Sequence, residues 1–137
     1  MSFKNQIVQK YVDAWRNLRA WGRSLDNVDV CISNRTCSTV GGWCKTYQQA
    51  IMIYQGPLHW MLLTVLHEYA HAVEISDHHD TAWQARFAAA VTEVTGVRVV
   101  GGCEDDYNVL NSAAEDAIKK WWPRTADAFA AKLLKVS

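Results

Sequence analysis

Hydrophobic residues recur at intervals of three and four over residues 3–21, which is the spacing of one face of an α-helix. The same period returns over residues 83–94 and again after Ser112, where Ser112 and Glu115 form a capping-box pair. Over residues 28–33 hydrophobic and polar residues alternate instead, as they do in a strand with one buried face. The pattern therefore predicts helices towards both ends of the chain and strands between them.

Two further strands are predicted over residues 37–45 and 49–54. Gly41 and Gly42 interrupt the first of these, which indicates a bulge or a close approach of the backbone to a neighbouring element. Pro57 follows the last strand and suits the first position of a helix. We therefore predict an α+β fold, in which a small three-stranded antiparallel sheet packs on that helix and helices flank both at the N- and C-terminal ends.

The segment after this central helix carries boundary signals of its own. Asp80 is a suitable N-cap for the next helix, and Gly96 is a suitable residue to end it. Residues 97–100 form either a short strand or an extended segment. The helix that starts at Ser112 is expected to stop near Pro123, and a last helix is expected beyond it.

Length and composition limit the classes of protein to consider. The chain has 137 residues, half of them hydrophobic and a fifth charged, so a single domain over residues 1–137 is expected. Fourteen Lys and Arg balance fourteen Asp and Glu, so no overall attraction to nucleic acid or to an anionic membrane follows. No apolar run reaches about 18 residues, and the N-terminus lacks the apolar core of a signal peptide. We expect a cytoplasmic protein without a membrane span, and the sequence carries no signal of its oligomeric state.

The four cysteines are Cys31, Cys37, Cys44 and Cys103. Their spacing is not the paired C-x-x-C pattern of a structural zinc site. Because no signal peptide is evident, free buried thiols are expected rather than disulfides. Two disulfides would instead indicate an oxidising compartment.

The central predicted helix contains an H-E-x-x-H pattern over residues 67–71, which read His-Glu-Tyr-Ala-His. His67 and His71 are four residues apart and lie above one another on one helix face, so both imidazoles can reach one ion. The rest of residues 60–73 is nearly all apolar, which indicates a buried helix in which polar groups are costly unless paired or bound to metal. The pattern is typical of zinc hydrolases, in which two histidines bind Zn2+ and the glutamate, here Glu68, takes a proton from the zinc-bound water.

A third ligand is needed, because catalytic zinc usually keeps three protein ligands and one open position. The candidates are the nearby histidine and carboxylate side chains: His78, His79, Glu74, Asp77, Asp80 and Glu93. Glu74 lies on the face of His71, where it would more plausibly orient a ligand than bind the ion. Glu93 is the alternative from a later helix. Spacing alone does not choose between the adjacent residues His78 and His79.

Residues 28–90 resemble the SprT-like (Spartan-type) zinc metallopeptidase family: a small sheet, an apolar helix with H-E-x-x-H, a short loop, and His-x-x-x-aromatic opening another helix. In that family the third histidine begins a segment such as His-Asp-x-x-Trp, and residues 79–83 read His-Asp-Thr-Ala-Trp. The resemblance therefore selects His79 as the third ligand beside His67 and His71. It also implies a zincin-like fold with Zn2+ as the cofactor.

The motif and the resemblance together predict a hydrolase, a zinc metalloendopeptidase that cleaves peptide bonds of protein or peptide substrates. Glu68 is the predicted general base, acting on a zinc-bound water. The resemblance implies that an extended peptide pairs with the strand before the zinc helix, so Ile51, Ile53 and Tyr54 are candidate substrate-binding residues. The candidate hydrogen-bond donors to the tetrahedral oxyanion are Tyr47, Tyr54, Tyr69 and His78.

Two other classes of function stay open at this stage. The first is a non-catalytic binding module stabilised by zinc, which would have a closed site of four ligands that includes both His78 and His79 or an aspartate. The second is a DNA-associated protease, because several members of the family that the chain resembles are of this kind. The balanced charge of the chain argues against DNA binding by this domain alone.

Overall fold

The computed structural model describes the backbone of residues 2–101 and 107–136, and the side chains as far as residue 122. Within these ranges the fold is α+β, as predicted, with a three-stranded sheet and four α-helices. The elements in chain order are α1 (Phe3–Ala14), the 3-10 helices η1 (Trp15–Asn17) and η2 (Arg19–Trp21), β1 (Asp29–Ile32), β2 (Gly42–Lys45), β3 (Ala50–Ile53), α2 (Leu58–Glu74), α3 (Thr81–Thr95) and α4 (Tyr107–Val136).

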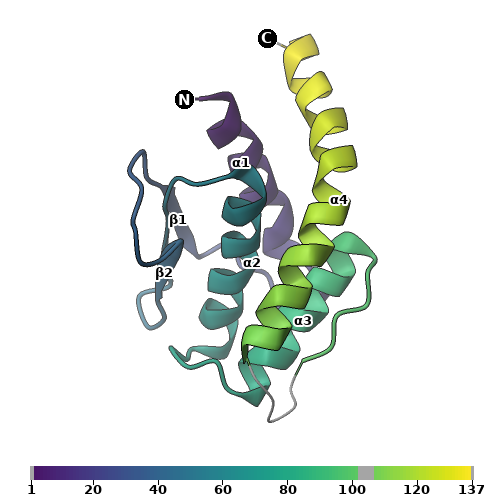
Figure 1. The fold of residues 1–137 in the computed structure, drawn as a ribbon. Helices are drawn as coiled ribbons and strands as arrows, with labels where there is room; N and C mark the ends of the chain where they lie inside the picture. The colour runs from purple at the N-terminus through teal and green to yellow at the C-terminus, as the bar shows by residue number, and fades with distance from the viewer. Residues whose placement is uncertain (1, 102–106, 137) are drawn as a thin grey trace.

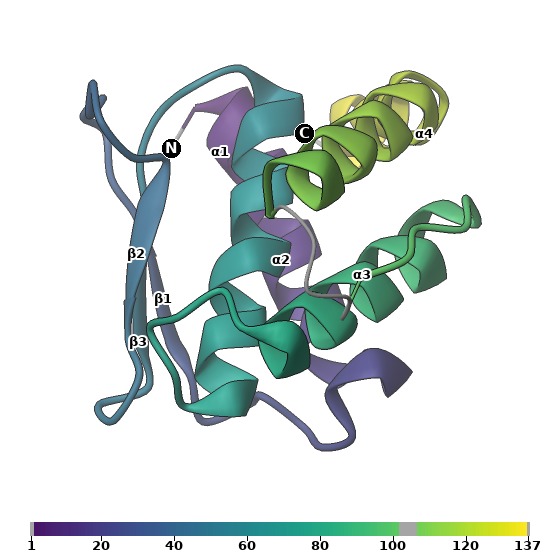
Figure 2. The same ribbon diagram turned by 60° about the horizontal axis from the view of Figure 1, so that its bottom comes forward.

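Helix α2 lies at the centre of the molecule. Figures 1 and 2 show the sheet on one side of α2, with α3 and α4 on the other. Helix α1 also packs on α2, so the central helix contacts the sheet and every other α-helix. This position explains the nearly continuous apolar sequence of α2, since a helix that is covered on all sides has no face left for solvent.

The N-terminal helix is shorter than the predicted span of residues 3–21. Helix α1 gives way to two 3-10 turns, between which Leu18 is extended, with ψ of 142°. The change of direction buries Trp21, whose indole Nε1 donates a hydrogen bond to the carbonyl oxygen of Trp15 at 2.7 Å. Gly22 ends the segment at φ of 70°, a left-handed conformation that favours glycine.

The sheet is mixed, so the prediction of an antiparallel sheet is wrong. The strand order is β1-β3-β2, with β1 parallel to β3 and β2 antiparallel to β3. Strand β3 is the most buried of the three, with Ile51 and Ile53 facing the core, and it takes the central place. The loop over residues 33–41 lets β2 pass to the far edge, so that β3 fits between the other two strands.

Gly41 and Gly42 mark the predicted close approach between the sheet and a neighbour, and this is confirmed. A Cβ atom at Gly42 would lie 2.5 Å from the carbonyl oxygen of Met52 and 2.8 Å from Cγ2 of Thr64 on α2. A Cβ atom at Gly41 would lie 2.7 Å from Oγ1 of Thr64. The two glycines therefore let the start of β2 touch the central helix.

The boundaries of α3 agree with those read from the sequence. The side chain of Asp80 accepts a hydrogen bond from the backbone N–H of Trp83 at 2.9 Å, and Gly96 ends the helix at φ of 73°. Residues 97–100 do not form a strand, so of the two predicted alternatives the extended segment remains. Cys103 lies outside the described residues.

Helix α4 differs from the prediction at both ends. It begins at Tyr107, upstream of Ser112, because Leu110 is buried at helical spacing from Ala114 and extends the apolar face. It continues through Pro123 as one helix, so the predicted break there is wrong. A proline inside a helix removes one backbone hydrogen bond and crowds the carbonyl one turn before it, which kinks a helix without always ending it.

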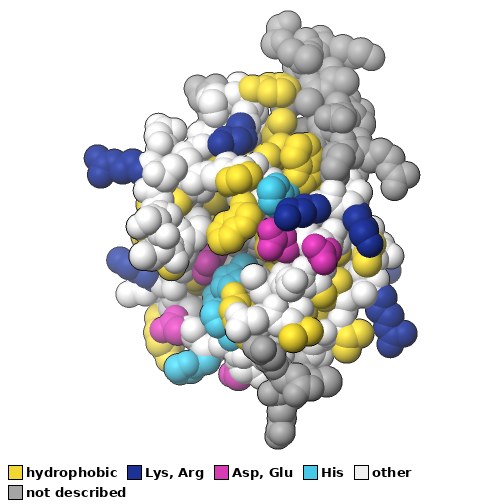
Figure 3. Space-filling view, viewed as in Figure 1, with side chains coloured by type: hydrophobic (Ala, Val, Ile, Leu, Met, Phe, Trp, Pro, Cys, Tyr) yellow, Lys and Arg dark blue, Asp and Glu magenta, His cyan; other side chains and the backbone are white. Residues whose placement is uncertain are grey.

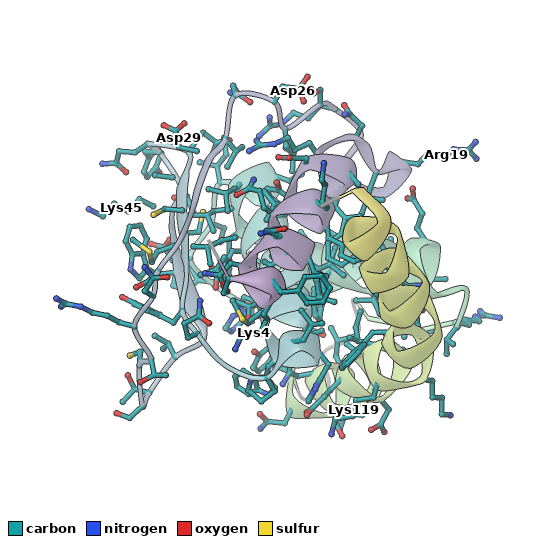
Figure 4. All side chains as sticks on the ribbon, turned by 90° about the horizontal axis from the view of Figure 1, so that it is seen from above. Lys4, Arg19, Asp26, Asp29, Lys45 and Lys119 are labelled. Carbon is teal, nitrogen blue, oxygen red and sulfur yellow. The ribbon has the colours of Figure 1, made fainter. Side chains whose placement is uncertain are left out.

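The described cysteines differ in exposure, and Cys44 packs against the core. Cys31, Cys37 and Cys44 are free thiols, and Cys31 is exposed, contrary to the expectation of burial. Figure 4 shows that Arg19, Lys45 and Lys119 point outward at separate places on the surface. Within the described part of the chain, no helix combines the length and the apolar character needed to cross a membrane.

The contact between Gly42 and α2 leads to a test of the packing. Gly42→Ala should lower the free energy of unfolding by about 1–3 kcal/mol, because the new methyl group overlaps backbone and α2 atoms. Gly56→Ala is the matched control, since a Cβ there meets nothing within 4 Å, and its effect should stay within about 0.5 kcal/mol. Urea denaturation of the three proteins measures the difference, and equal stabilities would contradict the described contact.

Candidate metal centre

Three histidine side chains converge on one point between α2 and the start of α3. His67 and His71 come from α2, and His79 comes from the loop before α3. One ring nitrogen from each lies within 4.8 Å of the others, and Nε2 of His67 is 3.1 Å from Nε2 of His79. Tetrahedral zinc with Zn–N bonds of about 2.0–2.1 Å separates its ligand nitrogens by about 3.3 Å. The His67–His79 spacing therefore fits two ligands of one ion.

A tight turn at the end of α2 brings His79 back towards the helix. Ile75 ends α2 in the left-handed conformation, with φ of 49°, and the chain reverses at Ser76. The carbonyl oxygen of Ser76 lies 2.6 Å from Nδ1 of His71, which donates to it. This bond leaves the lone pair of His71 on Nε2, the nitrogen available to a metal. Gln84 of α3 holds the other side of the turn, donating to the carbonyl oxygen of His79 at 3.0 Å.

The aromatic ring of Trp83 packs against all three imidazoles. The Trp83 ring, which is fully buried, lies 4.7 Å from the ring of His67, 5.1 Å from that of His71 and 4.6 Å from that of His79. Phe87 stacks on Trp83 with ring centres 4.9 Å apart, and both side chains are fully buried. Rigid rings beneath the histidines restrict their rotation and so preorganise the three nitrogens.

Burial sets the protonation of the histidines. Loss of solvent lowers the pKa of His67 well below its ordinary value, and the pKa values of His71 and His79 are lowered for the same first reason. Neighbouring imidazoles lower the pKa of His67 and His71 further, because two cations so close together would repel each other. The neutral imidazole is the form that binds metal, so all three side chains are ready to act as ligands at neutral pH.

Glu68 lies beside the histidines and is only 6% exposed. Burial raises the pKa of its carboxyl group to about 8. Within the described residues no hydrogen bond reaches this carboxylate, and it faces a pocket next to His67 and His79. A cation held by the histidines would favour the ionised carboxylate and stabilise it in this position.

The pocket has a volume of about 240 Å³ and opens on the surface seen in Figure 3, where histidine side chains are exposed near the middle with hydrophobic side chains above them. Its walls come from four parts of the chain: the loop before β2 with the first residue of that strand, one face of α2, the loop before α3, and the first turns of α4. The lining residues are Thr39, Val40, Gly41, Gly42, Trp60, Leu63, Thr64, His67, Glu68, His79, Tyr107 and Asn111.

The other candidate third ligands have different partners or positions. Glu74 forms an ion pair with Arg86 at 3.1 Å, and Glu93 accepts hydrogen bonds from two backbone N–H groups of η2 at 3.0 and 2.8 Å. Asp80 caps α3, and His78 is exposed. Within the described residues, the group of side chains able to share a metal is His67, His71 and His79.

The predicted peptide-binding strand does not lie at an edge, so that part of the prediction is wrong. Strand β3 is central, and both of its edges pair with β1 and β2. Ile51 and Ile53 are buried in the core beneath the sheet. Tyr54 accepts a hydrogen bond at its hydroxyl from the indole Nε1 of Trp43 at 3.1 Å. None of these three candidate residues lines the pocket.

The candidate oxyanion donors are also placed elsewhere. The hydroxyl of Tyr69 is buried and donates to the carbonyl oxygen of Val12 at 2.7 Å, and Tyr47 is 87% exposed. Two polar residues of α4, Tyr107 and Asn111, line the pocket instead and were missed from the sequence. Their spacing of four would have placed them on one helix face, had the helix been predicted to start at Tyr107 rather than at Ser112.

Comparisons of the chain with protein-family models, curated proteins and solved structures found no match. The resemblance to SprT-like peptidases therefore depends on the motif residues themselves. The function has to be argued from the geometry of the site.

Adjacent histidines provide a matched test of the metal centre. His79→Ala should weaken zinc binding by more than about 100-fold, because loss of a direct ligand exceeds the effect of losing a partner that only orients one. His78→Ala should bind zinc like the wild type, since the exposed His78 side chain lies outside the cluster. Competition against a chelator of known affinity measures both constants, and a larger loss in the His78 variant would refute the assignment.

Proposed function

We propose that the protein is a zinc-dependent metallopeptidase with a zincin-like site, hydrolysing peptide bonds of protein or peptide substrates. One observation carries the proposal: His67, His79 and the buried carboxylate of Glu68 line one open pocket, and His71 completes the cluster of three histidines beside it. Three protein ligands leave a position for water or substrate, which is the arrangement of catalytic zinc sites. Zinc fits the donor set because imidazole nitrogens in a compact, neutral cluster suit this ion.

Zinc held by His67, His71 and His79 would supply Lewis-acid activation of the attacking water and of the peptide carbonyl. Glu68 supplies the proton transfers. Its carboxylate accepts a proton from the water as the new C–O bond forms, and then gives that proton to the leaving amine as the C–N bond breaks. Burial alone raises the pKa of Glu68 to about 8, and a zinc ion beside the carboxylate would lower that pKa again. The ionised carboxylate is the form that accepts the proton of the water.

The pocket lining supports a preference for apolar side chains. Trp60, Thr64 and His67 follow one another along one face of α2, so the cleft runs from the histidines towards the start of the helix. Val40 and Trp60 are 48% and 43% exposed and both line the pocket, so they give it an apolar surface that a substrate side chain would cover. We infer that an aliphatic or aromatic side chain next to the scissile bond binds here.

A substrate main chain has a free sheet edge available beside the pocket. Within the described residues strand β2 pairs with β3 alone, and its first residue, Gly42, lines the pocket together with Gly41. An extended peptide that adds to this edge would pass the histidines. This edge replaces the central strand β3 in the predicted mode of substrate binding.

The alternative functions have less support. A zinc-stabilised binding module would need a fourth protein ligand, and the described residues offer a cluster of three. For a DNA-associated protease, a gathered basic surface beside the cleft would be expected, whereas on the face in Figure 3 the Lys and Arg side chains are scattered.

The role of Glu68 is tested by a pair of isosteric substitutions. Glu68→Gln should lower kcat by about 10²–10⁴-fold, because the amide cannot accept the proton of the attacking water, while zinc binding persists. Glu74→Gln removes a carboxylate from the same helix but from outside the pocket, and its kcat should match that of the wild type. Peptide hydrolysis and zinc content are measured on all three proteins. A fully active Glu68 variant would exclude this residue as the general base.

The substrate preference is tested at Trp60. Trp60→Ala should lower kcat/KM by about tenfold for peptides with a large apolar residue at the scissile bond, because that side chain loses its contact surface. Phe3→Ala is the control, since Phe3 is a comparably exposed aromatic residue, at 42%, and lies on α1 outside the pocket lining. A peptide library with one varied position reads out the preference. An unchanged profile in the Trp60 variant would contradict this assignment.

A further inference from the structure

Helix α4 supplies two polar side chains to the pocket wall that the proposed mechanism does not use. Tyr107 and Asn111 lie one turn apart on α4 and line the pocket together with His67 and His79. Both lie outside residues 28–90, the stretch that resembles a known family. Their roles therefore have to be derived from the contacts of this chain.

The ring of Tyr107 has a fixed place. It stacks on the imidazole of His79 with ring centres 4.1 Å apart and an angle of 4° between the planes, and its centre lies 6.1 Å from that of His67. Within the described residues its hydroxyl has no hydrogen-bond partner. The ring is thus held by packing while its polar end stays available to a molecule in the pocket.

The other hydroxyl groups near the site either donate within the protein or do not line the pocket. Thr64 lines the pocket, but its Oγ1 donates to the carbonyl oxygen of Trp60 at 2.8 Å. The hydroxyl of Tyr69 donates within the core, and Tyr54, whose hydroxyl accepts from Trp43, does not line the pocket. Tyr107 is therefore the tyrosine whose O–H can reach a substrate.

Peptide hydrolysis places a negative charge on the former carbonyl oxygen, and a fixed donor aimed at that oxygen stabilises the transition state more than the ground state. We propose that Tyr107 is a catalytic residue, whose hydroxyl donates a hydrogen bond to this oxyanion and keeps its proton throughout. The assignment rests on the proposed peptidase function. It gives α4 a direct part in the reaction in addition to closing the pocket.

Tyr107→Phe separates this role from the support of His79, because phenylalanine keeps the stacked ring and removes only the hydroxyl. We expect kcat to fall by about 10²-fold, as for the loss of one oxyanion donor, with little change in KM. Zinc content per chain should equal that of the wild type. Tyr47→Phe is the control for the same chemical change at a residue that is 87% exposed, and it should leave all values unchanged.

A second readout does not depend on turnover. A phosphinic peptide carries a tetrahedral, charged group in place of the scissile bond, and calorimetry should show at least tenfold weaker binding of it by the Tyr107→Phe variant. Wild-type kcat and phosphinic affinity in this variant would overturn the proposal, and so would loss of zinc, which would make Tyr107 a support of His79. If Asn111→Ala shows these losses instead, the donor is Asn111 and the proposal is wrong.

The same measurements distinguish a failure of the proposed peptidase function from a failure of the role assigned to Tyr107. A wild-type protein that binds zinc but cleaves no peptide and binds no phosphinic peptide would reject the peptidase function, and the assignment of Tyr107 with it. A wild-type protein that is active, with an equally active Tyr107→Phe variant, would reject only the role of Tyr107.

Discussion

The whole site depends on holding three neutral imidazoles within a few ångström of one another in the interior of the fold. The sheet and the helices α1, α3 and α4 pack around α2, and the chain turns tightly at Ser76 just after this helix. Trp83 fixes the result, since its buried ring contacts all three histidines. Burial has a cost for polar groups, and the same burial keeps the imidazoles neutral and makes Glu68 basic.

The segments that line the pocket contribute different kinds of side chain. Helix α2 provides two histidines, the glutamate and an apolar wall, and the start of β2 approaches it closely because Gly41 and Gly42 have no side chains. Helix α4 closes the opposite side with polar groups. The proposed peptidase function needs an apolar surface for the substrate side chain and a few placed polar groups for the reacting bond. The wall from α2 would supply the first and the wall from α4 the second.

Local signals in the sequence predicted the parts of this structure that depend on neighbouring residues. The position of His67, Glu68 and His71 on a buried helix follows from spacing and apolar context, and the caps at Asp80 and Gly96 follow from side-chain chemistry. The choice of His79 over His78 came from the resemblance, because adjacent residues differ only in how the turn after α2 directs them. The structure brings His79, and not His78, to the cluster.

Long-range features were not accessible in the same way. Hydrophobic alternation identifies a strand but does not say which strand is central, so the mixed order β1-β3-β2 was missed. Tyr107 and Asn111 were missed because the capping pair at Ser112 suggested a later start for α4 than tertiary packing gives it. Contacts between distant segments decided both cases.

The ligand environment of the zinc-loaded protein tests the central claim most directly. X-ray absorption at the zinc edge should show a first shell of nitrogen and oxygen only, at about 2.0–2.1 Å, with the outer scattering of imidazole rings. The half-buried thiol of Cys44 makes sulfur a real alternative in this part of the fold. A zinc–sulfur distance of about 2.3 Å, or a purified protein that takes up no zinc, would contradict the three-histidine site.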